Sequence, residues 1–90
     1  MFYVYALTST IANRMYIGMT SNIERRIFEH NSGQTKSTKC YKPWELFYSE
    51  KFETRLSARE REKYLKSGCG REFLKEILNK NRNNNCVSFL

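Results

Sequence analysis

The pattern of apolar and polar residues over the first twenty positions predicts a β-hairpin. Residues 2–8 are rich in aromatic and β-branched side chains, which is typical of a strand. Residues 9–14 are polar and predict a turn, and residues 15–19 predict a second strand. If the two strands pair antiparallel, Tyr5 and Tyr16 could come near one another, although the pattern does not fix the register.

A helix and a third strand are expected after the hairpin. Residues 20–22, Thr-Ser-Asn, offer side-chain oxygens that can cap the first amides of a helix, which we expect to run to about residue 31 and to end at Gly33. Residues 34–43 predict a polar loop that carries several lysines. Trp44 then leads into a strand from about residue 46 to residue 52.

Two more helices are predicted in the C-terminal half. Residues 57–60, Ser-Ala-Arg-Glu, match the S-x-x-E capping box, so we expect a helix from there to about Ser67. The Gly-Cys-Gly sequence at residues 68–70 predicts a break in the helix. Apolar residues at helical spacing then predict a last helix over residues 71–79.

A chain of 90 residues suits a single domain. We expect that domain at residues 1–79, and a polar, Asn-rich tail at residues 80–90 that frays. The order of the elements predicts an α+β fold with a three-stranded antiparallel sheet.

The charge of the chain points to a polyanionic partner. Lysine and arginine number 16 against 9 acidic residues, so the net charge is +7. Basic side chains neutralise phosphates and displace counterions, and aromatic residues make up 14% of the chain, which favours nucleic acid. Binding to ribosomes or to a membrane surface would give a similar charge.

The cysteines and the hydropathy indicate a compartment. Cys40, Cys69 and Cys86 are odd in number and lack C-x-x-C spacing, which argues against a disulfide framework and against a zinc site. We interpret them as free thiols in a reducing cytosol. The sequence shows neither a leader pattern nor an apolar run long enough for a membrane span, so a soluble cytoplasmic protein without membrane association is expected.

Helical geometry separates candidate site residues from solvent-facing ones in the first helix. Ile23 and Ile27 mark the buried side, and Arg26 and His30 lie beside it and share a face at i, i+4. Arg25 and Glu29 are expected to point farther out.

Glu62 holds an unusual position in the next helix. It lies four residues after Ala58 and three before Leu65, and so falls on the apolar stripe of the helix. A carboxylate that faces the core needs a partner or a metal, because desolvating it alone is costly. All nine acidic residues are glutamates, so a site for a hard cation would have to combine glutamate with carbonyls, water and substrate phosphate.

These residues give the chain a specific resemblance. From about residue 2 to residue 78 it resembles a GIY-YIG nuclease domain, close to the small single-domain members of that superfamily. The residues that carry the resemblance are Tyr5, Tyr16-Ile17-Gly18, Thr20, Arg26, His30, Asn31, Gly33, Ala58, Glu62 and Lys66. The chain departs from the motif at Tyr3, where the family has glycine. The resemblance implies a three-stranded antiparallel sheet flanked by helices, in agreement with the elements predicted above.

The resemblance also implies catalytic roles for Tyr5, Tyr16, Arg26, His30 and Glu62. Tyr5 would take the proton from the attacking water or hold that water, and Tyr16 would lie beside it. Arg26 would grip the scissile phosphate, since a guanidinium can hold two oxygens. His30 would orient a tyrosine or the phosphate, or would shuttle a proton. A free tyrosine titrates near ~10, so a base of this kind requires a cation such as Arg26 nearby.

The remaining implied roles concern metal and DNA. Glu62 would hold one Mg²⁺ or Mn²⁺, mostly through waters and phosphate. Gly18 would leave room in the pocket, and Thr20 would serve the local backbone or cap the helix. The residues expected to follow the nucleic-acid backbone are Arg25, Lys36, Lys39, Lys42 and Lys66.

Each of these residues also has a purely structural interpretation. Tyr5 and Tyr16 could be core aromatics, and His30 could cap or pack the end of its helix. Glu62 could form an ion pair with Arg26 or with Lys66. The arginine and the lysines expected to bind DNA could simply be solvated.

The sequence as a whole favours a metal-dependent DNA endonuclease that uses Mg²⁺ or Mn²⁺. The expected substrates are branched, flapped or damaged DNA, the expected context is DNA repair, and the sequence indicates no obligate protein partner. The main alternative is a nucleic-acid-binding module that keeps the fold without cutting. A basic RNA-associated protein would account for the charge but not for the tyrosines.

Overall fold

The computed structural model describes the backbone of residues 1–36 and 38–88, and the side chains of residues 1–36 and 38–80. The chain forms an antiparallel sheet of three strands. β1 (Phe2–Ser9) is the central strand, between β2 (Met15–Thr20) and β3 (Trp44–Phe52). The α+β class and the three-stranded antiparallel sheet expected from the sequence are confirmed.

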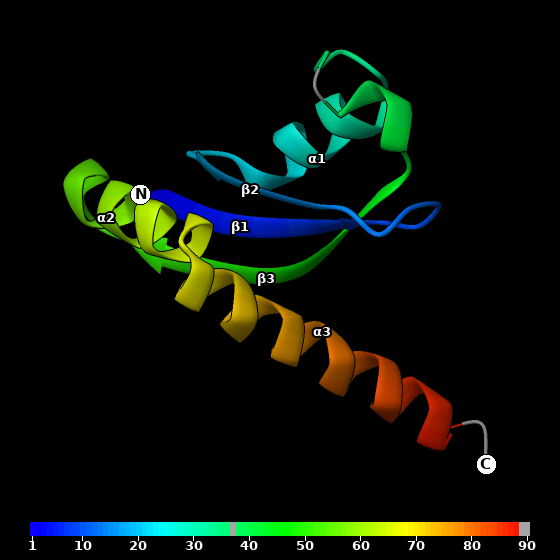
Figure 1. Ribbon diagram of the computed structural model, residues 1–90. Helices are drawn as coiled ribbons and strands as arrows, with labels where there is room; N and C mark the ends of the chain where they lie inside the picture. The colour runs from blue at the N-terminus through cyan, green and yellow to red at the C-terminus, as the bar shows by residue number, and fades with distance from the viewer. Residues whose placement is uncertain (37, 89–90) are drawn as a thin grey trace.

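Helices cover both faces of the sheet (Figure 1). α1 (Ile23–Asn31) lies on one face, and α2 (Arg55–Lys66) and α3 (Gly68–Ser88) lie on the other. A short 3-10 helix, η1 (Lys39–Tyr41), lies between α1 and β3 in the chain. No helix in the described part of the chain is long and apolar enough to cross a membrane.

The alternation of side chains along β1 divides the core into two layers. Val4 and Ala6 pack with residues of α2 and α3, including Leu65 and Leu74. Tyr5 and Leu7, at odd positions of β1, face α1 instead. They belong to a second cluster, whose other members are Trp44, Tyr16, Ile23, Ile27 and Tyr41. The aromatic residues singled out in the sequence therefore belong to the layer under α1.

β3 begins at Trp44, two residues earlier than expected. The side chain of Asn31 accepts a hydrogen bond from the Trp44 N–H at 2.6 Å and donates one to the Trp44 carbonyl at 3.2 Å. This pair of bonds fastens the end of α1 to the start of β3. Strand propensity carries no information about such a long-range contact.

The expected capping box of α2 is wrong. Thr54 is the N-cap, and its hydroxyl accepts a hydrogen bond from the Ser57 N–H at 3.2 Å. Ser57 is therefore the third residue of the helix, and Thr54 already serves the amide of the first turn.

The break before α3 is also shorter than expected. A single residue, Ser67, ends α2 and starts α3, because its carbonyl accepts from the Arg71 N–H at 3.0 Å. A Cβ atom on Gly70 would collide with the Tyr64 carbonyl oxygen, so this glycine permits the close approach of the two helices. The glycines at 68 and 70 thus lie inside α3 and do not separate the helices.

α3 also extends past residue 79, its expected end, to Ser88. It includes most of the Asn-rich segment for which fraying was expected. No glycine or proline lies between residues 79 and 88, so the sequence contains no strong terminator there.

Candidate active site

The register of the hairpin brings the two motif tyrosines together. Tyr5 on β1 pairs with Gly18 on β2, and Tyr16 lies two residues before Gly18 on the same face. The ring centroids of Tyr5 and Tyr16 are 6.2 Å apart. An added Cβ on Gly18 would lie 2.7 Å from the Tyr5 hydroxyl oxygen and 3.0 Å from Cε1 of Tyr16. Glycine at this position therefore makes room for both rings, as the sequence suggested.

The turn after β2 sets where α1 begins. The Thr20 hydroxyl accepts a hydrogen bond from the Asn22 N–H at 3.1 Å and donates to the Asn22 carbonyl at 3.3 Å. Asn22 then caps the helix by accepting from the Arg25 N–H at 3.1 Å. Thr20 is thus not the cap itself; it fixes the turn from which Arg26 and His30 are presented.

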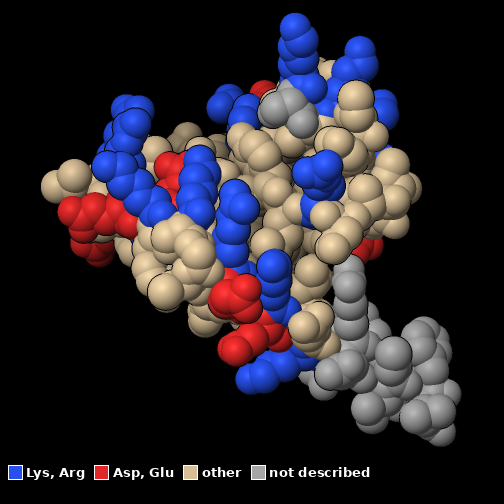
Figure 2. Space-filling view, viewed as in Figure 1, with Lys and Arg blue, Asp and Glu red and all other residues tan. Residues whose placement is uncertain are grey.

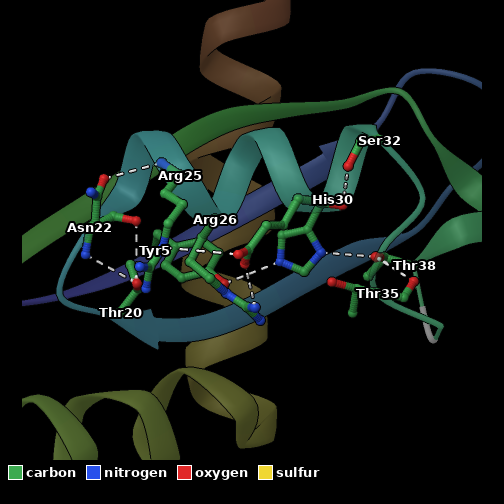
Figure 3. Close-up of polar contacts among 10 residues, drawn as sticks. Tyr5, Thr20, Asn22, Arg25, Arg26, His30, Ser32, Thr35 and Thr38 are labelled. Carbon is green, nitrogen blue, oxygen red and sulfur yellow. Dashed lines mark hydrogen bonds and ion pairs between the residues drawn. The ribbon is translucent and has the colours of Figure 1, made fainter.

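His30 is completely buried and connects β1 to the loop after α1 (Figure 3). Its Nε2 lies 3.2 Å from the Tyr5 hydroxyl oxygen, and its Nδ1 lies 2.8 Å from the Thr38 hydroxyl oxygen. The Thr38 hydroxyl donates to the Thr35 carbonyl at 3.3 Å. The ring of Tyr16 also packs on His30, with centroids 4.6 Å apart.

One tautomer of a neutral His30 satisfies all of these contacts. With the Thr38 hydroxyl donating to the Thr35 carbonyl, its oxygen can accept a hydrogen bond from Nδ1–H of His30. Nε2 then carries no proton and can accept a hydrogen bond from the Tyr5 hydroxyl. Thr35 and Thr38 belong to the loop that the sequence presented only as lysine-bearing, so their contribution was missed.

The environment keeps both partners of this bond neutral. Burial lowers the pKa of His30, the charge of Arg26 lowers it further, and Glu29 opposes the shift. Burial also raises the pKa of Tyr5, against the lowering effect of the adjacent Arg26, while Tyr16 and Glu62 add to the rise. We expected Arg26 to favour the Tyr5 phenolate, but its effect is smaller than that of burial.

Arg26 is held by a residue that the sequence analysis placed elsewhere. Its Nη1 lies 2.9 Å from Oε1 of Glu29, whose other oxygen lies 3.9 Å from Nε of Arg25. The Tyr5 hydroxyl, followed by Glu29, raises the pKa of Arg26 against the effect of burial. Glu29 is half-buried beside the site and does not point away from it; the i, i+3 spacing to Arg26 was the signal available in the sequence.

Glu62 reaches the site from the other helical layer. Its helix, α2, packs on the face of the sheet opposite α1, and its charge is close enough to raise the pKa of Tyr5. Its side chain is 19% exposed, and Oε2 lies 3.3 Å from Nζ of Lys66. Of the two ion pairs considered for Glu62, the structure contains the one with Lys66, and Arg26 pairs with Glu29.

The donor groups fit a metal that binds mainly through water and substrate. Within the described residues, no group of three His, Cys, Asp or Glu side chains could enclose a metal ion. Mg²⁺ commonly binds through one or two carboxylates and completes its shell with waters and phosphate oxygens. The Glu62 carboxylate, partly exposed and near Tyr5, suits Mg²⁺ or Mn²⁺ in this mode.

The side chains expected to follow DNA lie on the surface. Arg25, Lys36, Lys39, Lys42 and Lys66 are all exposed. Figure 2 shows Lys and Arg gathered over the loop after α1, at the top of the view, and again where α2 ends and α3 begins.

Comparison with known proteins identifies the family. A family model described as the GIY-YIG catalytic domain matches residues 1–73. The UPF0213 protein of Natronomonas pharaonis is 41% identical over 66 residues, which make up 72% of this chain and 76% of that protein. The UPF0213 protein of Staphylococcus haemolyticus is 38% identical over 76 residues, or 83% of this chain and 92% of that protein.

The solution NMR structure of a UPF0213 protein from Bacillus halodurans has a similar fold. It matches with a TM-score of 0.51 and 31% identity, over 86% of this chain and 85% of that one. The names of the UPF0213 relatives state no activity, and the family assignment rests on the GIY-YIG match. On the match over residues 1–73, the chain belongs to the GIY-YIG family of nuclease domains.

Proposed function

We propose that this protein is a metal-dependent endonuclease that hydrolyses phosphodiester bonds in DNA. The observation that carries the proposal is the hydrogen bond between the Tyr5 hydroxyl and Nε2 of His30, with Arg26 beside it. A tyrosine, a neutral imidazole and a guanidinium supply a water-binding hydroxyl, a proton acceptor and a phosphate clamp.

Arg26 is the group that binds the scissile phosphate. Its side chain is 30% exposed, and its Nη1 lies 2.9 Å from Oε1 of Glu29. A phosphate can use the free donors of the fork, and the ion pair with Glu29 keeps the fork oriented before DNA arrives. Binding of the phosphate brings negative charge next to a cation that is already in place.

Tyr5 holds the attacking water; when the Tyr5 proton passes to His30, the Tyr5 phenolate takes a proton from that water. In free side chains the two pKa values are about 10 and about 6.5, a difference worth about 5 kcal/mol against transfer. The shifts in this site raise the first pKa and lower the second, so the resting pair stays neutral. Transfer therefore depends on positive charge near the tyrosine oxygen when substrate is bound.

Glu62 is the residue that would hold Mg²⁺ or Mn²⁺. When bound, the metal supplies positive charge that stabilises the departing 3′ oxygen. The carboxylate of Glu62 pairs with Lys66, whose side chain is 54% exposed, so exchange of this partner for a metal requires the breaking of one partly exposed ion pair.

We propose branched, flapped or damaged DNA as the substrates and DNA repair as the context, in the cytoplasm. Cys40 and Cys69 are exposed free thiols, which supports a reducing compartment. The two surface groups of Lys and Arg support a substrate that extends beyond one phosphate.

A cleavage assay tests the proposal. Purified protein is incubated with labelled blunt duplex, flapped and branched DNA in Mg²⁺, in Mn²⁺ and in EDTA, with Tyr5→Phe purified in parallel. We expect cleavage in Mg²⁺ or Mn²⁺, none in EDTA, and loss with Tyr5→Phe. Binding to these DNAs without cleavage in either metal would favour the non-catalytic module, and equal cleavage by Tyr5→Phe would indicate a contaminating nuclease.

A further inference from the structure

A groove of about 470 Å³ lies beside the candidate active site. One wall comes from the β1–β2 turn and the first residues of β2, and the other comes from the end of α2 and from α3. The α3 residues in the wall are Arg71, Lys75 and Leu78, which share one helix face at i, i+4, i+7. The long helix thus presents a continuous face to the groove.

The groove is strongly cationic. Arg14, Lys66, Arg71 and Lys75 line it, and none of the lining residues in the described part of the chain is acidic. Lys66 and Lys75 pair with glutamates of their own helices at 3.3 and 3.8 Å, but both lysine side chains are more than half exposed. Exposed pairs of this kind are weak, so the lysines can turn to a phosphate at little cost. The charge fits an anion with several phosphates.

Four of the other lining residues are apolar, and the fifth is Asn13. Met15 and Leu78 are half-buried and offer aliphatic surface to the groove, whereas Ile17 is buried in the core beneath it and the Tyr16 ring packs in the layer under α1. Phosphates alone would leave the surfaces of Met15 and Leu78 unused, whereas a nucleotide base can pack on them. A paired base is turned toward its partner strand, so only an unpaired base can reach such a surface.

Two residues connect the groove to the candidate site. Tyr16 lines the groove and packs on His30 with a centroid distance of 4.6 Å. Lys66 lines the groove and pairs with Glu62, whose charge acts on Tyr5. A strand that occupies the groove would therefore lie next to Glu62, on the α2 side of the candidate site.

We propose that this groove binds an unpaired segment of the DNA strand next to the phosphate that is cut. The cations hold the backbone phosphates, and the apolar surfaces receive an unpaired base. The proposal rests on the function proposed above for the neighbouring site and adds the feature that selects flapped or frayed strands over intact duplex.

A pair of matched double variants tests the proposal in the full chain. Arg71→Ala with Lys75→Ala removes two groove cations, and Arg59→Ala with Lys63→Ala removes an exposed pair at the same spacing on α2, outside the groove. Each double variant lowers the net charge by the same amount. Thermal unfolding of both checks that the fold is retained.

Binding is measured in EDTA by fluorescence anisotropy, on a duplex with a short single-stranded flap and on the blunt duplex. We expect the groove variant to bind the flap at least about tenfold more weakly, with a log–log salt slope shallower by roughly 1.4 for two lost contacts to a single strand. The α2 variant should bind the flap nearly as well as the unmodified chain. Equal losses in the two variants would mean only diffuse attraction and would overturn the proposal.

Two further probes address the base. A flap of abasic nucleotides keeps the phosphates and removes the bases, and we expect it to bind several-fold to a hundredfold more weakly. Equal binding of the abasic flap, or competition by free deoxyadenosine monophosphate at the affinity of the flap, would contradict the proposed strand site.

Cleavage in Mg²⁺ or Mn²⁺ is recorded separately for the same proteins. Selective flap binding without any cleavage would remove the proposed nuclease function and leave the groove in place. Cleavage by the unmodified chain, with no difference in flap binding between the two double variants, would remove the groove proposal and leave the proposed nuclease function in place.

Discussion

Gly18 faces Tyr5 across the β1–β2 pair so closely that a single added carbon would lie 2.7 Å from the tyrosine hydroxyl oxygen. Gly18→Ala must therefore displace Tyr5 from His30 or strain the sheet. We expect a loss of about 1–3 kcal/mol in the free energy of unfolding and a loss of cleavage, measured by urea denaturation and on labelled DNA.

The chain contains a matched control for this change. Nothing lies within 4 Å of a Cβ added to Gly68 at the start of α3. Gly68→Ala should leave the stability unchanged or raise it by about 0.5–1 kcal/mol, because alanine loses less backbone entropy in a helix. If Gly18→Ala were as stable and as active as Gly68→Ala, the packing described around Tyr5 would be incorrect.

The stability of the protein should depend on His30 as the pH falls. The pKa of His30 is lowered in the folded state, so between that lowered value and the unfolded value of about 6.5 the unfolded chain binds more protons. The contribution of His30 is complete above about pH 6.5 and is lost as the pH falls through the folded pKa.

Because His30 is the single histidine of the sequence, the effect can be isolated. Urea unfolding at pH 7.5 and at pH 5.5 should show a larger loss of stability for the unmodified chain than for His30→Gln. An equal loss of stability between pH 7.5 and pH 5.5 in the two proteins would show that His30 is not held neutral by its burial.

Arg26 and Arg25 are adjacent arginines that should behave differently. Arg26 lies beside Tyr5 and is held by Glu29, whereas the Arg25 side chain is 64% exposed. We expect Arg26→Ala to weaken DNA binding and to lower cleavage by about 10²–10³-fold, the usual effect of losing one oriented charge. Arg25→Ala should change the affinity slightly and the rate little. Equal effects of the two changes would argue that phosphate is not bound specifically by Arg26.

A change at Glu62 should lower the cleavage rate without weakening DNA binding. Glu62→Ala should lower the cleavage rate by about 10²–10³-fold. The affinity for DNA should stay the same or rise slightly, because a negative charge near the phosphate is removed. Glu60→Ala, an exposed position on the same helix, is the control. Anisotropy in EDTA gives the affinity, and thermal unfolding excludes a loss of fold. A folded Glu62→Ala protein with the unmodified rate would remove Glu62 from the proposed metal site.

The sequence was sufficient for the features that depend on local periodicity. The hairpin, α1 with its Asn22 cap and the shared face of Arg26 and His30 follow from alternation, capping chemistry and helical spacing. The register that places Tyr5 opposite Gly18 did not follow, because several registers satisfy the same alternation.

Contacts over long distances in the chain account for the other differences. Thr38 supports His30 from eight residues away, within a loop whose composition gave no sign of a buried hydroxyl. The position of Glu29 depends on how α1 is rotated on the sheet, and the sequence put this half-buried residue too far toward solvent. At α2, the Thr54 hydroxyl caps the helix, three residues before the serine at which the capping-box pattern predicted its start.

The single-residue connection at Ser67 has a consequence for the phase of the two helices. Because no loop separates α2 from α3, the rotation of one helix about its axis determines the rotation of the other. One residue inserted after Ser67 would turn α3 by about 100°, since an α-helix makes a full turn every 3.6 residues. Arg71 and Lys75 would then point away from β2, while Glu62 and Lys66 would keep their places. The length of the connection at Ser67 therefore determines whether the basic face of α3 is aligned with the β1–β2 hairpin.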